Sequence, residues 1–381
     1  MSAANAAANV SVSEKKLIDI KGEMTDMADK IHDLKQTTNS FQVRGKVTGT
    51  KKNRFYTSGT SKNGSAYNVV EFGVEIAENK TVFIKLNGYT RDSVFYYKKG
   101  ENGAKGTTQK VAWKDRNKAP GKDFRLIGVN ITTGQDENGK NVNSTMTEYD
   151  AVEFLREHIH DGDSVFIKGN MVFSSYVDRN GQPHKKIDLV PTQISATQKP
   201  VDFDAEDFVE MAEFENTLVF SAIDKETDES DKPTGRFILS GYSIGFNTVE
   251  PVTFIIDADH AKLANNLRKA MKPGYSIKTY GRVNVFSDVS VVENDDDGWG
   301  EASPMERINS PVRREYVVYK ADPNTIEKDD YSEQDISTAL KKIKAAKEAA
   351  TNFGEKPSAG GVGIDARDWD DDDTDEDTPW D

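Results

Sequence analysis

Apolar and polar residues alternate with a period of two through the middle of the chain, which is typical of half-buried β-strands. The first such runs are Phe41–Val47, Tyr67–Ile76 and Thr81–Leu86, all rich in β-branched and aromatic residues. A short helix with an apolar face follows over Tyr149–His160, and two further strands extend to Ile194. Three strands, a helix and two strands form the element order of an OB barrel.

The same order recurs in the second half of the chain. Strands over Leu218–Ile223, Arg236–Ile244 and Pro251–Asp257 precede a helix over Asp259–Met271, and Arg314–Lys320 closes the set. Four residue pairs match at an offset of 112: Gly162 with Gly274, Ser164 with Ser276, Val165 with Ile277, and Gly169 with Gly281. The third strands match at an offset of 171, and 171 − 112 = 59 predicts about 59 extra residues before the first helix. We therefore predict a mainly β chain with tandem OB-fold barrels; a single large mixed sheet is the alternative.

The flanks of the barrels carry helical and low-complexity patterns. Apolar residues from Leu17 to Leu34 repeat at heptad spacing, which predicts a helix over Ser13–Gln36 that either packs on its own domain or forms a homo-oligomer. A second helix, capped by Ser332, is expected over Ser332–Phe353. The predicted organisation is an N-terminal helix (1–37), a basic barrel with the insertion (38–200), a second barrel (201–330), a helix (331–354) and a disordered acidic tail (355–381).

The formal net charge of −14 is an average over unlike segments. Residues 41–200 hold 25 Lys and Arg against 17 Asp and Glu, a net +8, so the remainder carries −22. The last 17 residues hold ten acids and one Arg, a net −9. The first barrel is thus a basic module, and the rest of the chain is acidic.

Cations and aromatic rings are interleaved in three loops of the first barrel, at the positions that flank an OB ligand groove. Single-strand binders need cations for phosphates and flat side chains for bases. The candidate residues are Lys51, Lys52, Arg54, Phe55, Tyr56, Lys62 and Tyr67 after the first strand; Tyr89, Arg91, Tyr96, Tyr97, Lys98, Lys99, Trp113, Lys114 and Arg116 in the insertion; and Tyr176, Arg179, Lys185 and Lys186 between the last two strands. Phe83 and Phe166 are assigned to the core. A smaller patch is possible on the second barrel, from Arg236, Lys278, Tyr280, Arg282, Arg313 and Arg314.

A barrel, a Gly-rich linker, an acid run and a terminal aromatic residue together resemble the bacterial and phage single-stranded DNA-binding proteins. The resemblance rests on layout and on the tail, Asp368–Asp381, whose Pro379 and Trp380 match the closing pair of the family's acidic tip. It implies single-stranded DNA binding in replication, recombination and repair, and a tail that recruits protein partners through Asp377, Pro379, Trp380 and Asp381. The chain departs from the family by ending in Trp380-Asp381 and by carrying two barrels, which favours a large phage-type protein.

The composition narrows the range of protein classes to which the chain could belong. There are no cysteines, which excludes disulfides and Cys-ligated metals and is compatible with a cytoplasmic protein, in the host cytoplasm if it is viral. We find no phosphate loop or nucleophile elbow. The run from His158 to Asp163 invites a metal site, but the turn before the fourth strand explains Gly162 and Asp163 equally well. We expect no enzymatic activity, no cofactor and no membrane partner. The alternatives left open are a scaffold protein whose barrels bind protein and an RNA-binding regulator.

Overall fold

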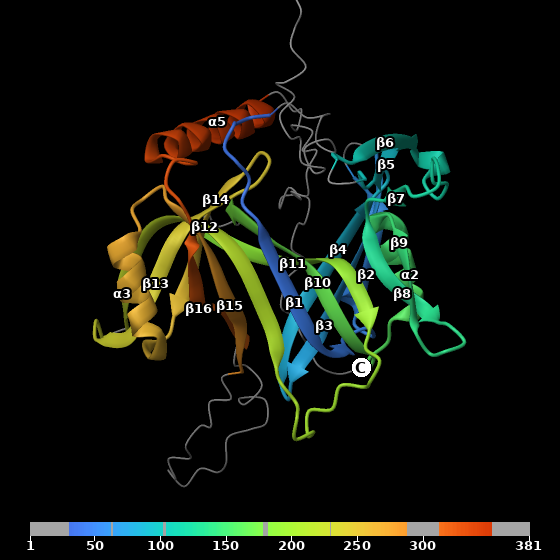
Figure 1. Cartoon of the computed structure of the whole chain (residues 1–381), viewed down its shortest axis with the longest axis horizontal. Coiled ribbons are helices and arrows are strands. Elements are labelled where there is room, and N and C mark those ends of the chain that lie inside the picture. The colour runs from blue at the N-terminus through green and yellow to red at the C-terminus, as the bar shows by residue number, and fades with distance from the viewer. Residues whose placement is uncertain are drawn as a thin grey trace, which may run out of the picture.

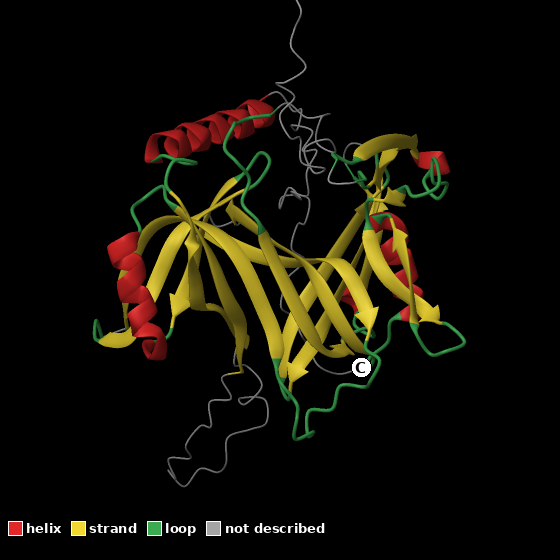
Figure 2. Ribbon diagram, in the orientation of Figure 1, coloured by secondary structure: helices red, strands yellow, loops and turns green. Residues whose placement is uncertain are grey.

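The computed structural model describes residues 30–61, 64–101, 104–177, 182–228, 230–287 and 312–352. Within these residues the protein is mainly β, as the alternating pattern predicts, and its strands form two barrels that stand side by side (Figure 1 and Figure 2). In the part of the chain that is described, every helix is too short or too polar to cross a membrane.

The first barrel has the strand connectivity of an OB fold. Its elements are β1 (Asn39–Thr48), β3 (Ala66–Ala77), β4 (Lys80–Tyr89), α2 (Glu148–His158), β10 (Ser164–Val177) and β11 (Pro183–Ala196). Neighbouring strands follow the closed order β1-β3-β4-β11-β10-β1, in which only the β4–β11 pairing is parallel. A 3-10 turn, η2 (Asn53–Phe55), and a short strand, β2 (Tyr56–Thr60), extend the loop after β1 and pair it with β3.

The second barrel repeats this connectivity. Its elements are β12 (Met211–Thr227), β13 (Pro233–Ile244), β14 (Val249–Ile256), η4 (Ala258–His260), α3 (Ala261–Ala270), β15 (Ser276–Ser287) and β16 (Val312–Glu327). The order β12-β13-β14-β16-β15-β12 closes through one parallel pairing, β14–β16. Figure 1 shows α2 and α3 on the outer flanks of their barrels.

Backbone hydrogen bonds confirm the repeat at the offset of 112. The amide of Gly162 donates to the Val47 carbonyl at 2.8 Å, and the amide of Gly274 donates to the Phe220 carbonyl at 3.0 Å. Both glycines have a positive φ, 94° and 88°, which the turn before the fourth strand requires and which side chains disfavour. The two first strands therefore correspond at an offset of 220 − 47 = 173.

The offset of 171 predicted for the third strands is wrong by one residue. The pairing ladders run Val47–Val74–Val82 in the first barrel and Phe220–Gly241–Val252 in the second. Val82 therefore corresponds to Val252, at an offset of 170, and both side chains are buried. A shift of one residue turns every side chain to the opposite face of the sheet. Phe83 consequently corresponds to Thr253 rather than to Phe254.

The two barrels are joined through their first strands. β1 pairs antiparallel with β12, and Phe41 lies directly opposite Phe214, its own equivalent at the offset of 173. A pseudo-two-fold axis thus passes through this pair. The same symmetry places β4 against β15 and β14 against β10. Ser175 Oγ on β10 donates to Glu250 Oε2 on β14 at 2.7 Å and helps to fix one barrel against the other.

The insertion between β4 and α2 folds into two parts. A small sheet is formed by β5 (Ser93–Lys98), β6 (Thr107–Ala112) and β7 (Arg125–Leu126), with η3 (Trp113–Asp115) after β6. A hairpin of β8 (Val129–Gln135) and β9 (Asn141–Met146) joins the barrel through β11. Arg116 forms a bidentate ion pair with Asp150 on α2, at 2.8 and 2.9 Å, and ties the small sheet to the first barrel.

Residues 30–36 have no regular secondary structure, so the helix predicted over Ser13–Gln36 does not include them; the rest of it lies outside the described residues. Ile31 and Leu34, the last two residues of the heptad pattern, pack instead on an apolar cluster of the second barrel and α5 (Glu333–Asn352). The amide of Ile31 donates to Asn247 Oδ1 at 2.9 Å, which helps to hold the segment against the second barrel. Ser332 caps α5, as predicted, by accepting from the Asp335 amide at 3.1 Å.

Candidate nucleic-acid interface

The outer face of β3 and β4 carries side chains that the core does not use. Val82, Ile84 and Leu86 on β4 point into the barrel and are buried, so Phe83 and Lys85 point outwards. Phe83 is half-buried, and its assignment to the core is wrong because strand periodicity places it on the face opposite Val82. Phe166 on β10 is half-buried for the same reason, between buried Val165 and Ile167.

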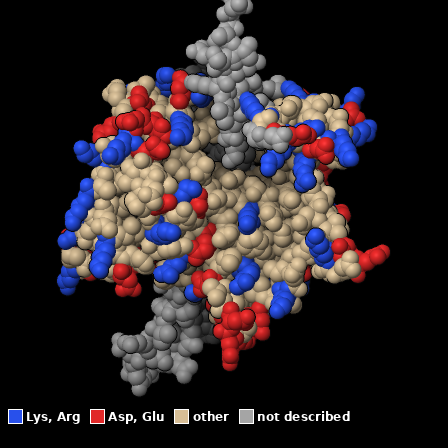
Figure 3. Space-filling model, viewed as in Figure 1, with Lys and Arg blue, Asp and Glu red and all other residues tan. Residues whose placement is uncertain are grey.

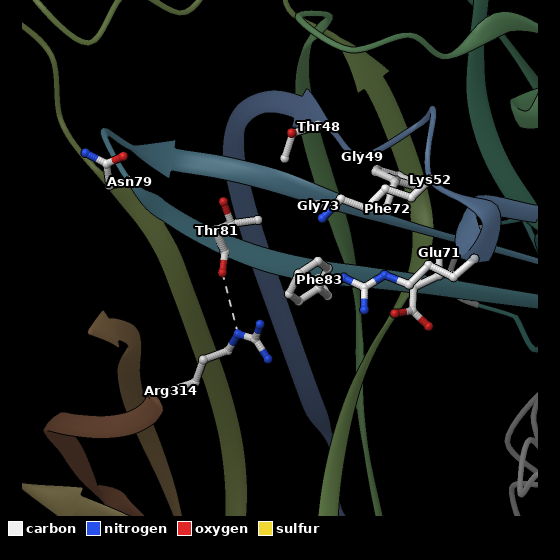
Figure 4. A pocket seen from close by; sticks show the side chains of 11 residues that line it. Thr48, Gly49, Lys52, Glu71, Phe72, Gly73, Asn79, Thr81, Phe83 and Arg314 are labelled. Carbon is white, nitrogen blue, oxygen red and sulfur yellow. Dashed lines mark hydrogen bonds between the residues drawn. The ribbon is translucent and has the colours of Figure 1, made fainter. Parts of the chain in front are cut away.

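Phe83 lies at the junction of two adjoining cavities, about 220 and about 470 Å³, which we call the inter-barrel groove. The first cavity is lined mainly by the loop after β1 and by β3 and β4 (Figure 4). The second is lined by β4, β10 and β11 of the first barrel and by β14, β15 and β16 of the second. Phe83, Glu71 and Arg314 line both cavities, so the groove is continuous along the outer face of the first barrel.

Two guanidinium groups lie over the ring of Phe83. Arg54, from the loop after β1, lies 5.1 Å from the ring centroid, and Arg314, from β16 of the second barrel, lies 4.5 Å from it. Arg314 Nε also donates to the Thr81 carbonyl at 3.5 Å, and Figure 4 shows it reaching across to β4. Desolvation, together with the nearby charge of Arg54, lowers the pKa of Arg314. A cation in this position is stabilised by an aromatic face and by an incoming anion.

The groove has a positive charge. Among the described residues, six cationic side chains line it against two acidic ones, a net 6 − 2 = +4: Lys52, Arg54, Lys85, Lys185, Lys186 and Arg314 against Glu71 and Asp188. Lys85 pairs with Glu71 at 3.7 Å, and Lys186 pairs with Asp188 at 3.4 Å. Desolvation, followed by the nearby charge of Lys186, nevertheless lowers the pKa of Lys85 and outweighs the opposing charges of Glu71 and Asp188.

Four of the residues predicted from the sequence line this groove: Lys52, Arg54, Lys185 and Lys186. Tyr67 and Tyr89 form a tilted pair, with ring centroids 5.9 Å apart, farther along the same face of β3 and β4. Lys51 is exposed on the neighbouring loop. Tyr176 stacks on His184 at 5.3 Å near the far end of β10 and β11.

Other predicted aromatic residues serve the fold. Phe55 is 8% exposed and belongs to the core, and Tyr56 donates a 2.6 Å hydrogen bond to Glu153 on α2. Tyr96 is 4% exposed and donates to the Arg116 carbonyl at 2.6 Å. These rings are therefore not available for base stacking: Phe55 and Tyr56 pack on the core of the first barrel, and Tyr96 is buried with Val94 in the small sheet.

The remaining insertion residues lie around the small sheet. Trp113 is half-buried, edge-on to Tyr149 and under the guanidinium of Arg116, which is itself held by Asp150. Tyr97 packs against Gly106, where any side chain would collide with its ring. Lys98 lies 3.9 Å from Asp123, whereas Arg91, Lys99 and Lys114 are exposed. Lys62, Arg179 and the tail residues Asp377, Pro379, Trp380 and Asp381 lie outside the described residues.

The patch expected on the second barrel does not form as one surface. Arg236 lies among three carboxylates, 3.4 Å from both Glu226 and Asp257 and in direct contact with Glu315. Lys278 pairs with Glu215 at 2.7 Å. Arg314 instead joins the groove of the first barrel. Sequence reasoning missed Phe83, Lys85, Phe173 and Tyr316 as groove residues, although the alternation Val82-Phe83-Ile84-Lys85-Leu86 is sufficient to place two of them outwards.

Acidic side chains mark other parts of the surface. Figure 3 shows acidic side chains gathered at the lower edge of this view, where the linker between the barrels runs. That linker carries exposed Asp202, Asp204, Glu206 and Asp207. In the described part of the chain, no group of three or more His, Asp or Glu residues is arranged to hold a metal ion. Asp163 accepts a hydrogen bond from the His160 amide, as its assignment to the turn predicts, and Asp161 accepts one from the Thr50 amide.

Comparison with known proteins gives one family and a set of solved structures. A family model described as YorF matches residues 37–356. No curated protein matches the chain. Two crystal structures of the single-stranded DNA-binding protein from Thermus aquaticus are similar to it. A deletion mutant gives a TM-score of 0.35 at 8% identity, with 75% of this chain and 94% of that chain covered. The wild type gives 0.35 at 7% identity, with 76% and 93% covered.

Proposed function

The chain belongs to the YorF family, and we propose that it binds single-stranded DNA, with little sequence preference and without catalysis, in the inter-barrel groove. The observation that carries this proposal is the ring of Phe83, which lies under two guanidinium groups in a groove with a net charge of +4. When one guanidinium group moves from the ring to a phosphate, a base of any sequence can stack on the ring face that it leaves, and the other cations can follow the phosphates. The bases of duplex DNA stay stacked on each other, so a duplex would be bound only through the electrostatic attraction between its phosphates and the cations.

The path of the strand follows the outer face of β3 and β4. From Phe83 the outward positions continue through Lys85 to Tyr89, and Tyr89 lies opposite Tyr67 on β3. Six residues of strand span about 20 Å. This length suits the lower end of the range of about 4–16 nucleotides that one OB barrel covers. The exposed cations of the insertion, Arg91, Lys99 and Lys114, then extend the positive surface beyond Tyr89.

The acidic C-terminal segment belongs to the same proposal. Residues 365–381 carry a net −9 and can compete with DNA for the groove as a tethered anion. The closing Pro379, Trp380 and Asp381, with Asp377, would recruit partner proteins of DNA replication, recombination or repair. An aromatic residue at the end of such a segment favours recruitment over a purely solubilising role.

Fluorescence anisotropy of labelled oligo-dT, titrated with the full chain at several salt concentrations, tests the function. We expect tight binding at low salt, weak binding to duplex of the same length, and a log–log salt slope of about −3 to −4 for roughly four to six phosphate contacts. Failure to bind oligo-dT at low salt would contradict the proposal. A clear preference for oligo-rU over oligo-dT would identify an RNA-binding regulator instead.

A further inference from the structure

The two barrels share a fold but present different outer faces. At the offset of 170, the second barrel carries Thr253 where the first carries Phe83, and Ile255 where the first carries Lys85. The pseudo-equivalent face therefore has neither the stacking ring nor the central ammonium group. Base stacking and phosphate pairing both depend on such groups.

The cations that the second barrel does carry on that face are neutralised internally. Arg236 and Arg282 lie among Glu226, Asp257 and Glu315, a local net of 2 − 3 = −1. Glu315 is 8% exposed, so a strand binding here would leave a buried carboxylate without its partner. Separating buried ion pairs costs far more than an exposed phosphate contact returns.

Arg314 is the exception, because it leaves its own barrel. It lies over the Phe83 ring at 4.5 Å and donates to the Thr81 carbonyl, both on β4 of the first barrel. The contribution is not reciprocal: Arg314 pairs with Val285, whose equivalent at the offset of 112 is Phe173, and Phe173 pairs with Ile187. The first barrel therefore presents an aliphatic side chain where the second presents a guanidinium group.

Arg314 also lines the same 470 Å³ cavity as Lys85 and Lys186. With Lys185, four cations from the two barrels line this cavity against two acids, Glu71 and Asp188, a local net charge of 4 − 2 = +2. Desolvation is the main cause that lowers the pKa of both Lys85 and Arg314, and a neighbouring cation adds to it, so an anion bound in the cavity would offset the cost of desolvating these two charges. A phosphodiester is an anion that fits between an aromatic platform and such a cluster.

We propose that the second barrel is not a second strand-binding module but completes the groove of the first, by supplying Arg314 to a phosphodiester seat formed with Lys85 and Lys186. This inference rests on the proposed function and makes it more specific. One chain then binds one strand, and the strand touches both barrels. The hydrogen bond between Ser175 and Glu250 helps to keep the two sides of the seat in register.

Arg314→Gln tests the seat, with Arg282→Gln as the matched control. Each variant removes one guanidinium charge from the second barrel, but Arg282 pairs with Asp257 at 3.6 Å and does not line either cavity. Anisotropy with labelled oligo-dT should show affinity reduced about tenfold by Arg314→Gln, the effect of losing one charge-assisted contact. The salt slope should fall by about 0.7, the loss of one phosphate contact. Arg282→Gln should change affinity less than about twofold.

Arg314→Lys is a second control, because it keeps the positive charge at this position. Its salt slope should be close to that of the parent protein. Thermal unfolding of all three variants reports whether they remain folded. If Arg314→Gln is folded and binds like Arg282→Gln, the seat does not exist, whereas the groove proposal stands as long as the parent protein binds. If the parent does not bind oligo-dT, the proposed function itself fails.

The number of strands per chain tests the second half of the inference. Native mass spectrometry with an oligo-dT of about eight nucleotides, well within the reach of one barrel, should saturate at one strand per chain. Two strands per chain at saturation, with Arg236→Gln removing one of them, would show that the second face binds independently and would overturn the inference.

Discussion

Replacing Phe83 by leucine removes the stacking platform from the centre of the groove while leaving a side chain of similar bulk on β4. Phe83 is half-buried and faces away from the barrel core, so the folded state loses little apolar burial. Stacking of one base on an aromatic ring contributes about 1–3 kcal/mol. Each guanidinium group loses its contact with the ring, but both remain in place to pair with phosphates. We therefore expect a loss of about 2 kcal/mol in binding, or about thirtyfold in Kd.

The assay is anisotropy with labelled oligo-dT at fixed salt, and Phe166→Leu is the matched control. Phe166 is also a half-buried, outward-facing phenylalanine of the first barrel, and Lys168 lies over its ring at 5.3 Å. It lies on β10 and lines neither cavity of the inter-barrel groove. The control should bind within about twofold of the parent, because a leucine in its place changes no groove contact.

The salt dependence separates stacking from charge. Since Phe83→Leu removes no cation, the log–log salt slope should be unchanged even though affinity falls. Equal binding by both leucine variants and the parent would refute stacking on Phe83. A reduced slope would show that the variant had displaced Arg54 or Arg314, so that the lost affinity was electrostatic.

Three further predictions concern the insertion, the tail and alkaline pH. Arg116→Gln should weaken the attachment of the small sheet to α2 by about 1–3 kcal/mol, because it breaks the half-buried bidentate ion pair with Asp150. Limited proteolysis should then cut this variant within residues 90–147 sooner than a Lys118→Gln control, which loses only a surface ion pair with Asp115. Deleting residues 365–381 should raise the affinity for oligo-dT at low salt, and this increase should disappear at high salt. An unchanged affinity at low salt would exclude competition between the tail and DNA. Burial raises the pKa of Tyr316 to about 12 from its usual 10. The folded state keeps a proton that the unfolded chain releases near pH 10, so this stabilisation is complete below pH 10 and is lost as pH rises towards 12, at about 1.4 kcal/mol per pH unit. Denaturant unfolding of Tyr316→Phe should show a shallower loss of stability over this interval, and an identical slope would contradict the assignment.

The sequence was sufficient to predict the architecture because the architecture depends on patterns that survive in one dimension. Alternation identifies the strands, and the glycines at 162 and 274 mark the same turn in both barrels. The direction of individual side chains was less accessible. Matching Phe83 to Phe254 looked sound by residue type, but it was one residue out of register, and in a strand that error exchanges inside for outside.

Contacts between the barrels could not be predicted at all from local patterns. Arg314 was grouped with its neighbours in sequence, although its partners Phe83 and Thr81 are more than 200 positions away. The aromatic residues of the insertion failed for a different reason. A three-stranded sheet must bury something, and this one buries Tyr96 together with Val94. Composition alone does not distinguish an aromatic residue that forms a core from one that is exposed and available for base stacking.

The overall negative charge and the basic groove are reconciled by screening. At physiological ionic strength, charges separated by more than about 8 Å of solvent interact weakly, so the −22 carried by the rest of the chain does not cancel the +4 of the groove. Only acidic segments that can reach the groove matter, and under the proposed function the tail, with its net charge of −9, is one such segment. Lower salt strengthens DNA binding and tail binding together, so the tail should depress apparent affinity most where the intrinsic affinity is highest. The intact chain should therefore show a shallower salt slope than a chain without residues 365–381.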